Sequence, residues 1–202
     1  MGLWIAETES AKYWLTVLTE IRWSKGFIIT SDDLPGIREA ITSVYPSVAY
    51  QGCVVHVIRN SIKYVSWKDM KAFRSDMKFI YKASTEESAL QALDALKMKW
   101  GSTYTLAVNV WERNWERIRT MFRFTEEIRT LIYTTNPMES FNRQLRKVTK
   151  NRSLFPDDTS ALKLLYLATH EVLKKWTVKI RDWSKILAQL SIHFEERLTK
   201  YL

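Results

Sequence analysis

The sequence has one cysteine among its 202 residues, so no disulfide bond can form within the chain. Its five glycines are well below the usual ~7%, which argues against a glycine-rich phosphate-binding loop and favours helices. No run approaches the roughly 18 consecutive apolar residues of a membrane span, so we expect no contact with a membrane. Together these absences are typical of a protein from a reducing compartment such as the cytoplasm.

Charge is the first positive clue to function. Hydrophobic residues make up 46% of the chain, enough for a core, and the net charge is +9. Residues 1–50 carry 4 basic and 6 acidic residues, whereas residues 51–202 carry 27 and 16, a surplus of 11 positive charges. A basic body of this kind indicates a polyanionic partner such as nucleic acid. A basic globular protein with no such partner remains the alternative.

The first quarter of the chain alternates between strand and helix patterns. Apolar and β-branched runs predict strands, and amphipathic spacing predicts helices. The expected order is a strand at 3–6, a helix at 10–20, a strand at 27–30, a helix at 37–45, and a strand that runs into a helix over 49–58.

The rest of the chain has helical periodicity. The pattern is helical from about 67 to 122, followed by a short bridge at 132–135 and a helix that begins near Pro137. Two further amphipathic helices are expected at about 158–176 and 180–202. The fold class is therefore α/β plus α.

Two adjacent carboxylates, Asp32 and Asp33, follow the expected strand at 27–30. Ligands and catalytic groups commonly lie at the carboxyl ends of the strands in open α/β sheets. The same two residues could instead cap the helix that Pro35 and Gly36 open, so both interpretations stand.

The segment 135–150 concentrates charge on one helical face. Placed at 100° per residue, Glu139, Arg143, Arg146 and Lys150 fall within about 60° of each other. Residues 140–152 contain five basic residues and no acidic one. Such a face suits a phosphate backbone that passes next to a bound metal. Alternatively, Glu139 closes the helix end three residues after Asn136 and pairs with the arginines.

Two other sets of residues favour structural roles. Cys53 and His56 have the spacing of a ligand pair but lack a second pair, so they do not predict a zinc site. Trp111 and Trp115 follow core spacing, although stacking of one of them on an unpaired base is an alternative.

Several motifs, in one order along nearly the whole chain, resemble the Mutator-family transposases of bacterial insertion sequences. The motifs are Gly2–Ile5, Glu9–Trp14, Ser31–Ile37, Glu39–Ile41, Gln51–His56, Ile58–Ser61, Ile132–Asn136, Glu139–Ser140, Arg143–Arg152, Phe155–Pro156, Ala161–Leu167, Lys175–Trp176 and Trp183.

The resemblance implies an RNase H-like sheet with a large helical insertion between its second and third acidic residues. We therefore expect a partial catalytic core at 1–64, the helical insertion at 65–130, and at 131–202 the helix that returns to the core together with the C-terminal helices. The first strands of the sheet are expected to be missing.

The resemblance also implies two-metal DNA strand transfer by an Asp-Asp-Glu triad, normally with Mg²⁺. Asp32 matches the second acid and Glu139 the third, and Cys53 and His56 match a Cys-x-x-His element expected to be structural or to hydrogen-bond behind the metal ligands. The expected partners are transposon ends, target DNA, and a second copy or a full-length transposase, in the bacterial cytoplasm near the nucleoid. The residues expected to bind DNA are Arg143, Arg146, Lys147, Lys150 and Arg152.

The sequence departs from the family pattern in several respects, and two of them bear on the catalytic residues. Asp33 stands where the family often has glycine, so Asp32 is the preferred ligand. The family's first catalytic Asp lies upstream of the motif at Gly2–Ile5 and has no match here. We therefore expect a truncated, inactive chain. The alternative function is a remnant that binds DNA or a transposase without catalysis.

Overall fold

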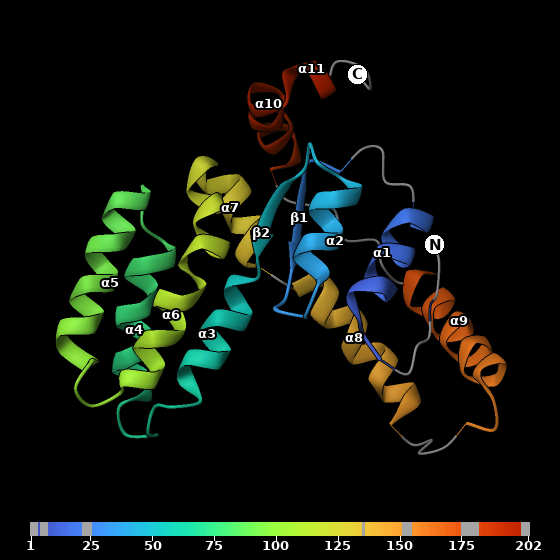
Figure 1. Ribbon diagram of the computed structural model, residues 1–202, viewed down its shortest axis with the longest axis horizontal. Helices are drawn as coiled ribbons and strands as arrows, with labels where there is room; N and C mark the ends of the chain where they lie inside the picture. Colours follow the sequence, from blue (N-terminus) through green and yellow to red (C-terminus); the bar gives the residue numbers. More distant parts are fainter. Residues whose placement is uncertain are drawn as a thin grey trace.

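The computed structural model describes residues 4, 8–21, 26–134, 136–150, 155–174 and 182–198. Helices dominate the described residues, and two short strands form a small sheet near the middle of the molecule (Figure 1). The elements are α1 (Ala11–Ile21), β1 (Ile28–Ser31), α2 (Ile37–Val44), β2 (Ala49–Gly52), α3 (Val54–Ile62), α4 (Met70–Tyr81), α5 (Glu86–Trp100), α6 (Thr105–Ile118), the short 3₁₀ helix η1 (Arg119–Arg123), α7 (Glu126–Tyr133), α8 (Asn136–Thr149), α9 (Asp158–Lys174), α10 (Trp183–His193) and α11 (Glu195–Leu198).

The sheet is a parallel pair joined by a helical crossover. Strand β1 leads through α2 into β2, with Ile28 opposite Ala49 and Ser31 opposite Gly52. This arrangement confirms the strand at 27–30, the helix at 37–45, and the strand that runs into a helix over 49–58. It agrees with an α/β plus α class, while the RNase H-like topology stays a prediction. The strand expected at 3–6 lies almost entirely outside the described residues.

Gly36, just before α2, lies against the first residue of α1. Its φ of 77° lies in the left-handed region, and a Cβ at this position would be 2.3 Å from the Cβ of Ala11. The backbone conformation and the space therefore both require glycine here. This close approach lets α1 pack directly across the start of α2.

Helices α3 to α7 enclose the main hydrophobic core, with α4, α5 and α6 at one side of the sheet (Figure 1). Trp111 of α6 is fully buried and its ring stacks on Tyr81, with 6.5 Å between ring centroids. Trp115 is also buried, so the core interpretation of both tryptophans is confirmed. The other fully buried side chains of this core include Phe73, Met77, Ile80, Leu96, Val108, Ile118, Met121 and Ile128.

Residues at both ends of helix α5 stabilise it. The Thr85 hydroxyl accepts a hydrogen bond from the backbone N–H of Ser88 at 3.1 Å, which caps the helix. Glu86 and Glu87 lie in the first turn and Lys97 and Lys99 in the last turn, where each sign of charge opposes the helix dipole.

A buried amide fastens the helical body to the sheet. The Gln51 side chain is fully buried in β2, and its Nε2 donates to the carbonyl oxygens of Ile118 at 3.0 Å and Gly52 at 2.8 Å. At Gly52, a Cβ would lie 3.0 Å from the Cβ and carbonyl oxygen of Arg117. The end of α6 therefore lies directly against β2.

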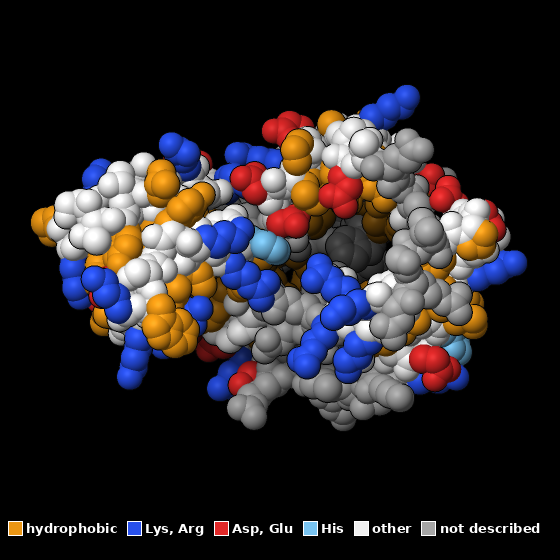
Figure 2. All heavy atoms as spheres, turned by 90° about the horizontal axis from the view of Figure 1, so that it is seen from below, with side chains coloured by type: hydrophobic (Ala, Val, Ile, Leu, Met, Phe, Trp, Pro, Cys, Tyr) orange, Lys and Arg blue, Asp and Glu red, His pale blue; other side chains and the backbone are white. Residues whose placement is uncertain are grey.

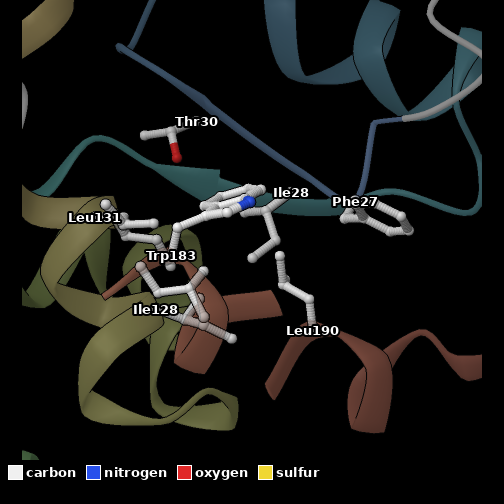
Figure 3. Close-up of a pocket in the computed structure, with 9 residues that line it drawn as sticks. Phe27, Ile28, Thr30, Ile128, Leu131, Trp183 and Leu190 are labelled. Carbon is white, nitrogen blue, oxygen red and sulfur yellow. The ribbon is translucent and has the colours of Figure 1, made fainter. Parts of the chain in front are cut away.

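The C-terminal helices close over the other end of the strands. Arg197 of α11 donates to the carbonyl oxygens of Ser47 and Gly26, and its guanidinium covers the Phe27 ring. An apolar cavity of about 290 Å³ lies between β1, α7 and α10, with Trp183 beside Ile28 (Figure 3). No described helix is long and apolar enough to cross a membrane.

Two predicted boundaries are wrong. The bridge expected at 132–135 is helical through Tyr133, because Ile128 and Ile132 continue a buried stripe and extend α7. The single helix expected at 180–202 is two helices, α10 and α11, because the backbone leaves the helical region at Phe194. There the Phe194 ring packs against Phe27 and Phe124.

Candidate active site

The carboxyl ends of β1 and β2 form one edge of the sheet because the strands are parallel. The Cys53 N–H donates to the Ser31 carbonyl oxygen at 2.8 Å, so the chain leaves both strands at the same level. Asp32 and Asp33 follow β1 directly, and Cys53 precedes α3. The sequence therefore places two carboxylates and a thiol at this edge.

Arg117 of α6 holds the loop that carries the two carboxylates. Its Nη2 donates to the Asp32 carbonyl oxygen and to the Tyr50 hydroxyl, both at 3.2 Å. Its Nη1 forms an ion pair with the Asp33 carboxylate. The Tyr50 hydroxyl also lies 3.1 Å from the Ser31 hydroxyl. The Arg117 side chain is only 15% exposed, whereas its partner Asp33 is 71% exposed, so the ion pair lies at the surface and the other contacts of Arg117 are more shielded from water.

The two neighbouring aspartates have different surroundings. Asp33 is exposed and paired with Arg117, whereas the half-buried Asp32 carboxylate has no hydrogen bond or ion pair among the described residues. Oxygen atoms of carboxylates are the ligands that Mg²⁺ prefers. Asp32 therefore has the chemistry and the free oxygens that a metal ligand needs, and this supports the preference for Asp32 over Asp33.

Cys53 and His56 lie behind this edge. Burial raises the pKa of the Cys53 thiol, and the negative charge of Asp32 also raises it, against the effect of hydrogen bonds from the backbone of His56 and Val55. A protonated thiol does not bind zinc. Among the described residues no three His, Cys, Asp or Glu side chains gather as metal ligands. The structural role expected for Cys53 and His56 stays a prediction.

Helix α8 carries the remaining candidates. Arg143, Arg146, Lys147 and Lys150 are all exposed, and none has an ion pair within the described part of the chain. Phe141 and Leu145 are half-buried, and α8 packs against α9. Figure 2 shows Lys and Arg side chains gathered beside a hollow on one face of the molecule.

Two candidates cannot be placed. The side chain of Glu139 and the whole of Arg152 lie outside the described residues, so the structure gives no distance from either of them to Asp32. The backbone of α8 includes position 139 in its first turns. The capping and metal-binding interpretations of Glu139 are therefore both still open.

The sequence did not reveal Arg117 or Tyr50 as members of this site. Arg117 lies 84 or 85 positions from the aspartates it contacts, and no local spacing relates them. At 100° per residue, Arg117 falls outside the buried stripe of α6 that contains Trp115 and Ile118, so helical periodicity did not mark it either.

Comparison with known proteins decides the family. The family described as "Transposase, Mutator family" matches residues 1–179. The chain belongs to this family. The transposase for insertion sequence element ISRM3 of Rhizobium meliloti is 40% identical over 202 residues, which cover 98% of this chain and 50% of the relative. A probable transposase of Corynebacterium diphtheriae is 34% identical and covers all of this chain and 66% of its own length.

A more distant relative is also a transposase. The transposase of IS256 in transposon Tn4001 of Staphylococcus aureus is 25% identical over 191 residues, or 91% of this chain and 48% of the relative. The chain spans about half the length of most of the curated relatives it matches. Membership of the Mutator family confirms the resemblance recognised in the sequence.

Proposed function

We propose that this chain takes part in DNA strand transfer during transposition, with Asp32 and Glu139 as ligands of Mg²⁺. The observation that carries the proposal is the half-buried Asp32 carboxylate, which has no partner among the described residues, at the carboxyl edge of the sheet in a chain of this family. Two metal ions in such a site stabilise the attacking and leaving oxygens of an in-line phosphoryl transfer.

The residues of the chain hold the site and the DNA. Arg117 holds the backbone carbonyl of Asp32, which positions the residue that carries this carboxylate at the edge of the sheet. The exposed cations of α8, with Arg152, neutralise phosphates of the DNA backbone. Water attacks first and nicks the transposon end, and the freed terminal hydroxyl then attacks a phosphodiester of the target DNA. The partners are both DNAs and a second copy or a longer transposase.

Catalysis by this chain alone is expected to fail. The family pattern has three carboxylates and the sequence matches two of them, so we expect DNA binding without cleavage. The measurement is nicking of DNA that carries the terminal inverted repeats, with and without Mg²⁺. Robust Mg²⁺-dependent nicking by the isolated chain would contradict this expectation.

The cations of α8 give a second prediction. Replacing Arg143 and Lys147 by Ala should reduce the slope of log affinity against log salt by about 1.8, because each neutralised phosphate of duplex DNA contributes about 0.9. Gel shifts across a salt series measure the slope. Lys163→Ala/Lys174→Ala on α9, which removes the same charge, is the control. Equal slopes in both double variants would exclude α8 as the DNA-binding helix.

A second candidate function is DNA binding without any catalysis. The observation that favours it is the surplus of 11 positive charges over residues 51–202, which does not depend on a metal. Such a chain would bind transposon DNA or a full-length transposase and interfere with transposition. DNA binding that is independent of Mg²⁺, and unchanged by Asp32→Asn, is the result expected for this function.

A further inference from the structure

A hollow lies between the end of α3 and the middle of α6, beside the carboxyl edge of the sheet. Its volume is about 480 Å³, within the usual range for sites of small ligands. A DNA duplex does not fit into this volume, because the width of its major groove alone is about 12 Å. Besides Asp33, the polar and aromatic residues that line the hollow are Asn60, Lys63, Tyr64, Arg113, Asn114 and Arg117.

The charges in this hollow favour an anion. Arg117 is already paired with Asp33, the carboxylate in the lining. Lys63 donates to the Asn60 amide oxygen at 2.7 Å and has no carboxylate partner among the residues that the structure describes. Arg113 has no hydrogen bond or ion pair within the described part of the chain. Two cations are therefore uncompensated, and a phosphodiester would neutralise them.

The other groups in the lining favour a nucleotide over a bare phosphate. Tyr64 is 50% exposed at the hollow, so one face of an aromatic ring is available for a base. Base–aromatic stacking is the usual way in which proteins hold unpaired bases. Asn60 adds an amide that can contact the edge of a base.

The hollow adjoins the candidate active site. A second pocket of only about 10 Å³ shares Asp33, Asn60, Asn114 and Arg117 with it and is also lined by Gly52 and Cys53. These two residues lie at the end of β2, next to the loop of Asp32. A strand seated between α3 and α6 would therefore lie next to the loop that carries Asp32 and Asp33.

We propose that the hollow between α3 and α6 binds an unpaired segment of a DNA strand, with Lys63 and Arg113 on its phosphates and Tyr64 under one base. This proposal rests on the proposed function, because it names how that substrate approaches Asp32. It adds a site on the helical body that is separate from the cations of α8.

The test compares a labelled blunt duplex with the same duplex that carries an unpaired oligothymidine tail, by fluorescence anisotropy. The tail should strengthen binding to the unaltered chain. Lys63→Ala/Arg113→Ala should weaken binding of the tailed DNA about tenfold and flatten its salt slope by about 1.4, or about 0.7 per single-strand phosphate. Tyr64→Ala should weaken binding of the tailed DNA about fivefold or more, whereas Tyr64→Phe, which keeps the aromatic ring, should bind it like the unaltered chain.

Arg74→Ala/Lys78→Ala on α4 is the matched control, since it removes two exposed cations that do not line the hollow. Equal losses in the two double variants, or equal losses on blunt and tailed DNA, would overturn the proposal. The proposal would also be overturned if free thymidine monophosphate competed with the tailed DNA as strongly as an unpaired oligothymidine strand does. If the unaltered chain binds neither DNA, the proposed function itself fails.

Discussion

Trp111→Ala should lower the free energy of unfolding by about 3–5 kcal/mol, the largest stability effect we expect from one substitution. Trp111 is fully buried and stacks on Tyr81, with an angle of 6° between the ring planes. Because α4, α5 and α6 meet around this ring, its removal leaves a large cavity in the core. Urea unfolding followed by circular dichroism measures the change.

Trp111→Phe separates the loss of volume from the loss of the indole N–H. The Trp111 Nε1 is buried without a hydrogen-bond partner, so phenylalanine gives up no hydrogen bond and should cost much less than alanine. Met98→Ala, at a side chain that is 82% exposed, is the surface control. If Trp111→Ala unfolds at the same urea concentration as Met98→Ala, the core described here is wrong.

Asp32→Asn should remove most of the metal binding at the carboxyl edge of the sheet. We expect at least about a tenfold loss, since even the groups that support metal ligands are worth about 10–100-fold. Fe²⁺ with ascorbate in place of Mg²⁺ generates radicals that cut the nearby backbone. Cleavage near residues 32 and 139 in the unaltered chain, detected by mass spectrometry, would locate the ion without any need for DNA cleavage.

Asp33→Asn is the matched control for this experiment. It removes the same charge one residue away, but Asp33 is already committed to Arg117 and should leave the iron cuts in place. Glu139→Gln tests the other proposed ligand and should act like Asp32→Asn. If the cuts persist in Asp32→Asn and vanish in Asp33→Asn, the metal is bound by Asp33 and our proposal is wrong.

Local signals predicted much of the fold. The β-branched run at 27–30, followed by Pro35 and Gly36, was enough to place β1 and α2, because each signal acts within a few residues. The start of α5 is likewise set locally, by the hydrogen bond that the Thr85 hydroxyl accepts from the Ser88 N–H. The break at Phe194 was missed because it depends on Phe27 and Phe124, which are distant in the chain.

The candidate site shows the same limit. The position of Asp32 at a strand end was available from the sequence, and the family resemblance predicted it as a metal ligand. That Asp33 is paired, while Asp32 has no partner among the described residues, depends on Arg117, which α6 brings to the edge of the sheet. Periodicity describes which face of α6 is apolar but not which loop the residues beside that face meet.

The hydrogen bonds of Arg197 have a practical consequence. It binds the carbonyl oxygens of Gly26 and Ser47, which precede the two strands, whereas Asp32 follows β1. The four residues of β1 separate these levels by about 13 Å. A tether attached through α11 would therefore hold the protein by the side of the sheet that faces away from Asp32, and single-molecule experiments could immobilise it there while the DNA approach stays open.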